Sequence, residues 1–272
     1  MRIAFIGGGH MSTALIGGLL RHGAPVNSIR VADPVPAQLE RLAYEFGVQG
    51  ASDNRTAVAQ ADLVVLAVKP QDMPQAAREI APGLATGRHL VVSVAAGVRL
   101  ADLARWLGRS IPTVRAMPNR PALIGAGITA LHAGPGVTAD DRRAVERLMA
   151  AAGETIWLDD ESQMDAATAI SGSGPAYFFL LVEALEAAGI ALGLPHETAR
   201  RLAAETARGA GRMAAESGVE PAVLREQVTS KGGTTAAALA VFEAGGMRDT
   251  VRRAVEAAAR RSAELAVQSG GA

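Results

Sequence analysis

The stretch Ile3-Ala-Phe-Ile-Gly-Gly-Gly-His-Met-Ser-Thr-Ala-Leu-Ile16 decides the fold of the N-terminal half of the chain. An apolar run leads directly into consecutive glycines, and an apolar helical segment follows at once. A strand, a glycine turn and a helix in immediate succession are typical of a βαβ unit that binds a phosphate group. The stretch therefore predicts a parallel sheet with a ligand site at the carboxyl end of its first strand.

Similar apolar runs recur along the first half of the chain. Residues 29–32, 63–68 and 90–94 are rich in Val, Ile and Leu and show no polar alternation, which is typical of strands buried on both faces. Segments of helical length separate the runs, at residues 11–21, 36–46 and 71–80, and residues 48–51 could form a short strand. We expect residues 113–117, 128–132 and 155–158 to extend the sheet, and a helix over residues 139–151.

The chain changes character after residue 159. Gly and Pro then divide helical segments at residues 176–192, 196–216, 222–228, 235–243 and 247–267. We predict an α/β Rossmann-type dinucleotide-binding domain over residues 1–160, followed by an all-α domain over residues 161–272. Because the helical part is short for its apolar content, we expect it to bury that surface in an obligate oligomer.

The composition of the 272-residue chain excludes several classes of protein. Its 27 Lys and Arg residues balance 27 Asp and Glu residues, which argues against a nucleic-acid partner. The chain has no Cys, so a disulfide scaffold and a Cys nucleophile are excluded, and no grouping of His, Asp and Glu indicates a metal. The most apolar stretch, residues 176–194, carries Glu183 and Glu186, which predicts a buried helix and no membrane span. With no secretory signal visible, we expect a soluble cytoplasmic protein.

The glycine stretch has the features of a dinucleotide-binding loop. Gly7 would permit the tight turn, Gly9 would let a pyrophosphate approach the backbone, and Ser12 stands at the third glycine position of the GxGxxG pattern. The N–H groups at the start of the following helix would face the anion. The alternative is an ordinary glycine-rich turn between a strand and a helix.

Polar residues follow several of the expected strands. Asp33 could accept hydrogen bonds from ribose hydroxyls and repel a 2′-phosphate, which favours NADH, or it could belong to an Asp-Pro turn. Lys69 could meet a phosphate or remain a solvated lysine, and Asn54 could reach the adenosine half or form a local turn.

A second candidate anion site lies in the helical half. Val228-Thr-Ser-Lys-Gly-Gly-Thr-Thr235 places two glycines and several hydroxyl residues directly before an Ala-rich helix. Consecutive N–H groups at a helix start can bind an anion, and a small carboxylate is the natural guest. The alternative is a capped helix after a loop, with Thr234 as the N-cap. A pyrophosphate site paired with a carboxylate site is what a dehydrogenase needs.

Together these motifs resemble the pyrroline-5-carboxylate reductase family. The matching segments are Phe5-Ile-Gly-Gly-Gly-His-Met11, Ala67-Val-Lys-Pro70, Ser93-Val-Ala-Ala-Gly97, Met117-Pro-Asn119, Ile170-Ser-Gly-Ser-Gly-Pro-Ala-Tyr177 and Thr229–Thr235. The resemblance implies reduction of (S)-1-pyrroline-5-carboxylate to L-proline with NADPH or NADH. It also implies a Rossmann domain followed by a helical dimerisation domain, with dimers often gathered into a ring.

The resemblance also implies roles for individual residues. The coenzyme would be held by Gly7, Gly8, Gly9, His10, Met11 and Ser12 at its pyrophosphate, by Asn54, Ala67, Val68, Lys69 and Pro70 along its length, and by Ala95, Ala96, Gly97 and Asn119 near the nicotinamide. The substrate carboxylate would be received by Ser230, Gly232, Gly233 and Thr234. Thr235 would hydrogen-bond the ring nitrogen, and Glu161 matches a position associated with the product.

This chain departs from the family pattern at several positions. His10 stands where Asn is frequent, Arg120 where Thr is common, and Lys231 where Pro usually precedes the two glycines. Loss of the Pro ring should loosen the loop. Lys231 also leaves open a β-hydroxyacid dehydrogenase, since enzymes of that plan generally use a lysine acid on the helical domain. A non-catalytic dinucleotide-binding protein is the remaining alternative.

Overall fold

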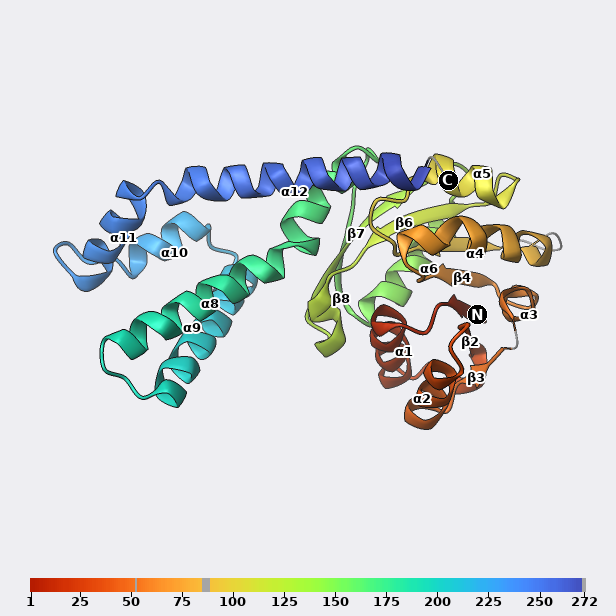
Figure 1. Cartoon of the computed structure of the whole chain (residues 1–272), viewed down its shortest axis with the longest axis horizontal. Helices are drawn as coiled ribbons and strands as arrows, with labels where there is room; N and C mark the ends of the chain where they lie inside the picture. The colour runs from red at the N-terminus through yellow and green to blue at the C-terminus, as the bar shows by residue number, and fades with distance from the viewer. Residues whose placement is uncertain (52, 85–88, 271–272) are drawn as a thin grey trace. The chain divides into compact units, whose positions relative to one another are not determined.

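The computed structural model describes residues 1–51, 53–84 and 89–270, which form two compact units (Figure 1). The α/β unit comprises residues Met1–Ser173 and Ala257–Ala272, and the helical unit comprises Gly174–Glu256. The α/β unit thus continues past residue 160 and includes the last turns of the C-terminal helix.

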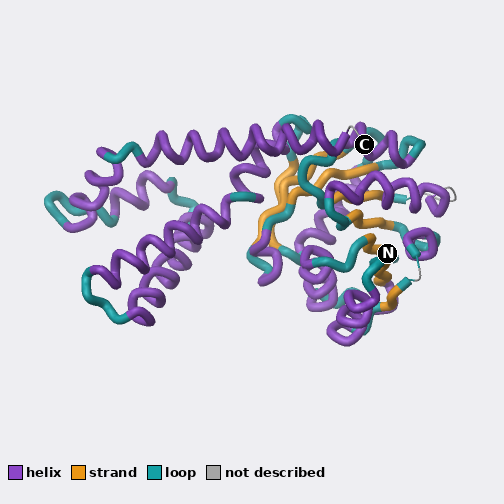
Figure 2. The backbone as a smooth tube through the Cα atoms, in the orientation of Figure 1, coloured by secondary structure: helices purple, strands orange, loops and turns teal. Residues whose placement is uncertain are grey.

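An eight-stranded sheet with the order β3-β2-β1-β4-β5-β6-β7-β8 forms the centre of the α/β unit (Figure 2). All neighbouring strands are parallel except β6 and β7. The strands are β1 (Ile3–Ile6), β2 (Ile29–Ala32), β3 (Gln49–Gly50), β4 (Leu63–Leu66), β5 (Leu90–Ser93), β6 (Thr113–Met117), β7 (Gly127–Ala133) and β8 (Gly153–Trp157). The expected strands are therefore all present, with ends that differ by a few residues.

Helices cover both faces of the sheet. They are α1 (His10–Arg21), α2 (Pro36–Phe46), α3 (Asn54–Val58), α4 (Met73–Ile80), α5 (Leu100–Leu107), α6 (Ala139–Ala150) and α7 (Gln163–Ala167). Short 3-10 helices span Val26–Ser28, Pro70–Asp72, Ala81–Leu84 and Arg120–Ile124, and a π-helical turn spans Thr168–Gly172. Helices α3, α5 and α7 were not predicted from the sequence, and each of them has eight residues or fewer.

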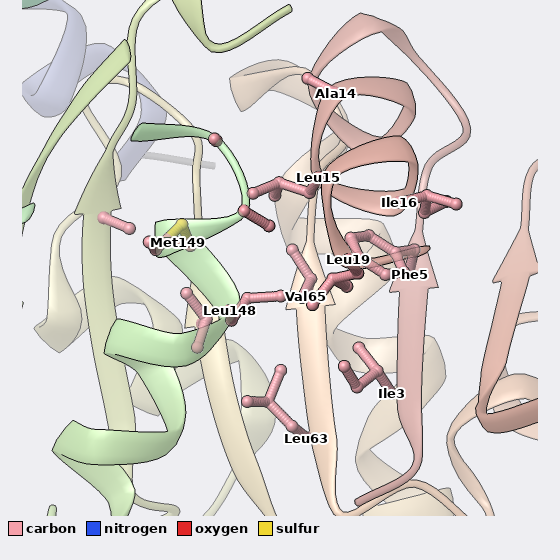
Figure 3. Close-up of a cluster of buried hydrophobic side chains, with 14 of the residues drawn as sticks. Ile3, Phe5, Ala14, Leu15, Ile16, Leu19, Leu63, Val65, Leu148 and Met149 are labelled. Carbon is pink, nitrogen blue, oxygen red and sulfur yellow. The ribbon is translucent and has the colours of Figure 1, made fainter. Parts of the chain in front are cut away.

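The side chains of the sheet separate into two cores because successive residues of a strand point to opposite faces. Phe5 and Val65 pack with Leu15 of α1 and Leu148 of α6 on one face (Figure 3). Residues of α3, α4 and α5 cover the other face, where Ile6 and Leu66 are fully buried. The strand ends that carry the candidate site are thus set in a rigid three-layer frame.

The helical unit is built from α8 (Gly174–Ala191), α9 (His196–Glu216), α10 (Pro221–Gln227), α11 (Thr234–Ala244) and the first turns of α12 (Met247–Gly270). Only Gly174, Ala199 and Ala203 of this fully described unit are buried. Large apolar side chains stay exposed, including Phe178 at 66% and Val241 at 73%. This supports the expectation that the helical part cannot hide its apolar surface alone.

The expectation of a buried helix over residues 176–194 is wrong for the single chain. Among the residues that the structure describes, one helical stretch, residues 163–191, is long and apolar enough to cross a membrane, and only 6% of its most apolar window is buried. The apolar sequence was correctly recognised as helical. Its burial cannot come from within the helical unit, because that unit has almost no interior.

Gly18 of α1 gives a test of this packing. A Cβ built at Gly18 would lie 2.0 Å from the carbonyl oxygen of Ala151, so backbone would have to move. Gly18→Ala is expected to lower the free energy of unfolding by about 1–3 kcal/mol or more, measured by urea denaturation at a fixed protein concentration. The control is Gly211→Ala in exposed α9, where an added Cβ meets no atom and should be neutral or stabilise by roughly 0.5–1 kcal/mol. Equal midpoints for Gly18→Ala and the unmodified chain would contradict this packing.

Candidate functional site

The glycine loop connects β1 to α1 in a conformation that requires glycine. Gly7 has a φ of +99°, and a Cβ there would lie 2.7 Å from the carbonyl oxygen of Ala67 on the neighbouring strand connection. The Gly7 N–H donates to the carbonyl of Ala32 over 2.8 Å, which ties the turn to the end of β2. The carboxyl ends of β1, β2 and β4 therefore converge on this loop.

The start of α1 presents free donors and open space. Gly9 is the N-cap, and a Cβ built on it would meet nothing within 4 Å. Within the part of the chain that the structure describes, no acceptor is found for the backbone N–H groups of His10 and Met11, as expected for the first turn of a helix. Ser12 is fully buried and donates its hydroxyl to the carbonyl of Gly7 over 2.5 Å, so it shapes the loop from within.

Asp33 lies against the glycine loop with both carboxylate oxygens engaged. Oδ2 accepts from the Gly8 N–H over 2.7 Å, and Oδ1 accepts from the Val35 N–H over 2.8 Å. The carboxylate therefore closes a local turn and also lines the pocket described next, and its contact with a ribose stays a prediction. Its negative charge is held beside the loop in a fixed orientation.

A pocket of about 630 Å³ opens beside the glycine loop. It brings together a set of the predicted coenzyme residues, which are Gly7, Gly9, Asp33, Asn54, Ala67, Val68 and Lys69. Gly8, His10, Met11, Ser12 and Pro70 belong to the adjoining backbone, whereas Ala95, Ala96, Gly97 and Asn119 are not part of its lining. Asn54 begins α3 behind its N-cap Asp53 and donates to Glu79 over 2.6 Å.

Arg41 of α2 is a charged neighbour of the loop that the sequence analysis missed. Its Nη2 donates to the carbonyl of Gly8 over 3.1 Å and to the hydroxyl of Thr13 over 2.9 Å. Nη1 forms an ion pair with Glu45 at 3.2 Å. No sequence pattern relates a residue of α2 to the glycine loop before α1. The position of the Arg41 guanidinium beside that loop is therefore known only from the packing of α2.

Two of the family motifs, the one at residues 117–119 and the one that begins at Ile170, are in contact at the end of β6. The Asn119 side chain is buried and bridges two backbone groups, accepting from the Ile128 N–H over 3.0 Å and donating to the Ser171 carbonyl over 3.1 Å. A Cβ at Gly172 would lie 2.6 Å from Cε of Met117. Residues 117–119 and the turn at Ser171 and Gly172 therefore meet in space, with the Asn119 amide as their connection.

Glu161 is anchored within the α/β unit. Its Oε1 accepts from the Leu100 N–H over 2.9 Å and from Nη1 of the buried Arg115 over 3.2 Å. The preceding Asp160 accepts from the Ser162 N–H over 2.8 Å, and this backbone hydrogen bond holds the pKa of Asp160 below its ordinary value. Among residues 1–51, 53–84 and 89–270, no group of three or more His, Asp or Glu side chains could hold a metal ion.

The glycine loop of the helical unit is a tight turn followed by a helix. The Gly233 N–H donates to the Ser230 carbonyl over 3.0 Å, and Gly232 has a φ of +75°. These features match a type II turn, with Lys231 and Gly232 as its central residues. The alternative with Thr234 as the N-cap is wrong: the N-cap is Gly233, because its backbone is extended and α11 begins at Thr234.

The start of α11 offers a set of outward donors. The first intrahelical bond is that from the Ala237 N–H to the Gly233 carbonyl. In this fully described unit the N–H groups of Thr234, Thr235 and Ala236 have no protein acceptor, and the Thr235 side chain is half-buried. A carboxylate would satisfy such donors and complement the helix dipole. The loop thus has donors at a helix start, and the binding of an anion there stays a prediction.

Comparisons with known proteins account for both halves of the chain. Residues 161–265 match the family model described as pyrroline-5-carboxylate reductase dimerisation. Residues 2–97 match that described as NADP oxidoreductase, coenzyme F420-dependent. These matches confirm a parallel α/β nucleotide-binding domain followed by a helical dimerisation domain.

Individual relatives extend over nearly the whole chain. A pyrroline-5-carboxylate reductase of Pseudomonas aeruginosa is 51% identical, with 99% of this chain and 98% of the relative covered. The structure of such a reductase from Coxiella burnetii is 41% identical with a TM-score of 0.93, covering 97% of this chain and 98% of that chain.

The Plasmodium falciparum enzyme, whose crystal structure has NADP bound, is 29% identical with a TM-score of 0.86 and 98% of both chains covered. The similarity in sequence and structure therefore extends over both the α/β unit and the helical unit. The chain belongs to the pyrroline-5-carboxylate reductase family.

Proposed function

We propose that this chain reduces (S)-1-pyrroline-5-carboxylate to L-proline at the expense of NADPH or NADH, the last step of proline biosynthesis. The observation that carries the proposal is 51% identity to a pyrroline-5-carboxylate reductase over 99% of the chain. The two helix starts preceded by glycine turns support it, because one suits a pyrophosphate and the other a small carboxylate.

The α/β unit fits a dinucleotide. A Cβ at position 9 would take up the open space beside the loop, and the N–H groups of His10 and Met11, for which the described residues offer no acceptor, adjoin it. We assign the pyrophosphate to Gly7–Ser12 and the remainder to Asp33, Asn54, Ala67–Pro70, Ala95–Gly97 and Asn119. When bound, the reduced coenzyme supplies a hydride to the imine carbon of the substrate. The protein supplies position and a fixed set of donors.

The substrate half requires no strong acid. We assign the carboxylate of the substrate to Ser230, Gly232, Gly233 and Thr234, with Thr235 at the ring nitrogen. A cyclic imine can take its proton from water, so the hydroxyl of Thr235 needs only to orient the nitrogen. This agrees with a loop that carries hydroxyl groups and backbone donors and no His–Asp pair.

The alternative of a β-hydroxyacid dehydrogenase would make Lys231 the acid. Lys231 is exposed at the second position of the turn. The family match gives that alternative no support. A direct assay decides between the candidate functions: loss of absorbance at 340 nm is expected when pyrroline-5-carboxylate is added to the chain with NADPH or with NADH. No turnover at high protein concentration, or turnover only with small β-hydroxyacids, would refute the proposal.

The dimerisation family implies self-association of the helical part. We propose that residues 1–160 serve the coenzyme and residues 161–272 serve the substrate and the dimer, and that dimers gather into a ring. The exposed α8 then becomes a buried helix in the assembly, which is compatible with a cytoplasmic enzyme. Apolar residues such as Phe178 and Phe179 would otherwise stay in water, and their burial against a second copy is favourable.

Thr235→Val tests the proposed substrate contact. Valine is nearly isosteric but cannot hydrogen-bond the ring nitrogen, so kcat is expected to fall by roughly tenfold, the worth of one hydrogen bond of about 1.4 kcal/mol. The coenzyme dissociation constant and the melting temperature should stay unchanged. Thr198→Val in α9, which is exposed, serves as the matched control. A kcat equal to that of the unmodified chain would remove Thr235 from the mechanism.

Lys231→Pro tests the turn. Proline is favoured at the second position of a type II turn and reduces the freedom of the unliganded loop, so KM for pyrroline-5-carboxylate should fall or stay within about twofold. Lys231→Ala removes the charge without adding the ring and separates the two effects. If both substitutions raise KM by roughly tenfold, an ion pair between Lys231 and the substrate carboxylate outweighs loop rigidity.

Asp33→Asn tests the electrostatics of the coenzyme pocket. A carboxylate near a 2′-phosphate opposes it by about 1 kcal/mol at 4 Å in water, so removing the charge should raise the ratio of kcat/KM for NADPH over NADH by roughly fivefold. Asn keeps an oxygen that can accept from a neighbouring N–H. Asp140→Asn, an exposed carboxylate of α6, is the control. An unchanged ratio would show that Asp33 does not face the 2′ position.

A further inference from the structure

The loop after β5 ends at Leu100, whose N–H is bound by the side chain of Glu161, a residue distant in sequence. Leu100 begins α5, and its N–H is one of the helix-start donors that have no partner within a helix. The Glu161 carboxylate accepts from it over 2.9 Å, at a helix end where negative charge is favoured. The short connection from Ser93 to Leu100 is thus attached to the segment that follows β8.

Arg115 of β6 forms an ion pair with the Glu161 carboxylate and restricts its position. Its side chain is only 4% exposed, whereas that of Glu161 is 28% exposed, and their ion pair measures 3.2 Å. Arg115 is also the register partner of Ser93 on β5, the strand from which the loop leaves. A buried guanidinium needs its counter-charge, so Glu161 has little freedom to turn away.

The loop after β5 also packs against the last turns of α12. Gly97 has a φ of +71° and is buried, and a Cβ there would lie 3.2 Å from the Ala266 nitrogen and 3.4 Å from Cβ of Leu265. These last turns of α12 belong to the α/β unit and are fixed to α7 by a 2.6 Å hydrogen bond from Ser262 to Asp165. Packing against α12 at Gly97 and the hydrogen bond to Leu100 therefore both restrict this loop.

We propose that Glu161 is a positioning residue for the coenzyme: through Leu100 it sets the shape of Ala95–Gly97. This rests on the proposed function, because it takes those residues to lie beside the nicotinamide. It departs from the expectation that Glu161 contacts the product. The loop follows β5, whose neighbour β4 leads into the pocket residues Ala67 and Val68, so both lie at the carboxyl edge of the sheet.

The experiment separates this role from a merely structural ion pair. Arg115→Met/Glu161→Ala removes both charges, so no buried charge is left alone, but the Leu100 N–H loses its acceptor. Arg115→Met/Glu161→Gln also removes both charges and keeps an acceptor for Leu100. Dissociation constants for NADPH and NADH are measured by isothermal titration calorimetry without substrate, with melting temperatures alongside. Glu154→Ala, an exposed carboxylate of β8, is the control.

The alanine pair is expected to weaken coenzyme binding by roughly fivefold, the effect of one lost hydrogen bond, while the glutamine pair stays within about twofold. Glu161→Asp provides a second route if the alanine pair does not fold. It keeps the charge beside Arg115 but is one methylene shorter, and it should also weaken binding by roughly fivefold. Unchanged coenzyme binding in whichever of these two variants folds would overturn the proposal.

The outcomes also separate this inference from the proposed function. A raised KM for pyrroline-5-carboxylate with unchanged coenzyme binding would make Glu161 a substrate residue and overturn the positioning role alone. If the unmodified chain binds coenzyme but does not turn over pyrroline-5-carboxylate, the proposed reaction fails while the binding comparison still decides the role of Glu161. If the unmodified chain binds neither NADPH nor NADH, both proposals fail.

Discussion

The approach of Gly7 to the Ala67 carbonyl is the contact on which the nucleotide half depends. It requires a positive φ and the absence of a Cβ at the same residue, and only glycine meets both demands. Because the chain turns so sharply there, α1 starts beside the ends of β1 and β4, and the N–H groups of its first turn, which have no acceptor among the described residues, adjoin the pocket. A bulkier residue would move the helix start away from the strand ends, and the site would lose its donors.

The helical unit is governed by a different constraint. It has almost no interior, and its large apolar side chains face outward. A folded single chain would leave that surface in water, which the match to a dimerisation family explains. The same exposure accounts for the ambiguity of α8, whose length and composition would suit a membrane span. The match to a dimerisation family favours a second copy of the chain, and not a membrane, as the partner of this apolar face.

Much of the fold could be predicted, because continuous apolar runs are typical of strands that are buried on both faces of a sheet. β1, β2 and β6 begin and end where the sequence indicated, whereas β4 stops at Leu66 because Ala67 and Val68 turn to line the pocket. The missed α5 carries Leu100, Leu103 and Leu107 at helical spacing, a signal that was available in the sequence. Arg41 beside Gly8 and Arg115 beside Glu161 could not be predicted, because no local pattern relates residues of separate elements.

The loop over residues 228–235 shows how a departure from the family pattern is understood once the backbone conformation is known. From sequence, Lys231 in place of proline indicates only a loop with more freedom. The hydrogen bond from Gly233 to Ser230 and the positive φ of Gly232 identify a turn that proline would suit without distortion. The chain therefore retains the turn through Gly232 and its hydrogen bond. At position 231 it has a positively charged lysine where a proline would make the loop stiffer. Since the donors at the start of α11 depend on the turn and not on the proline ring, the loop keeps its geometry without proline.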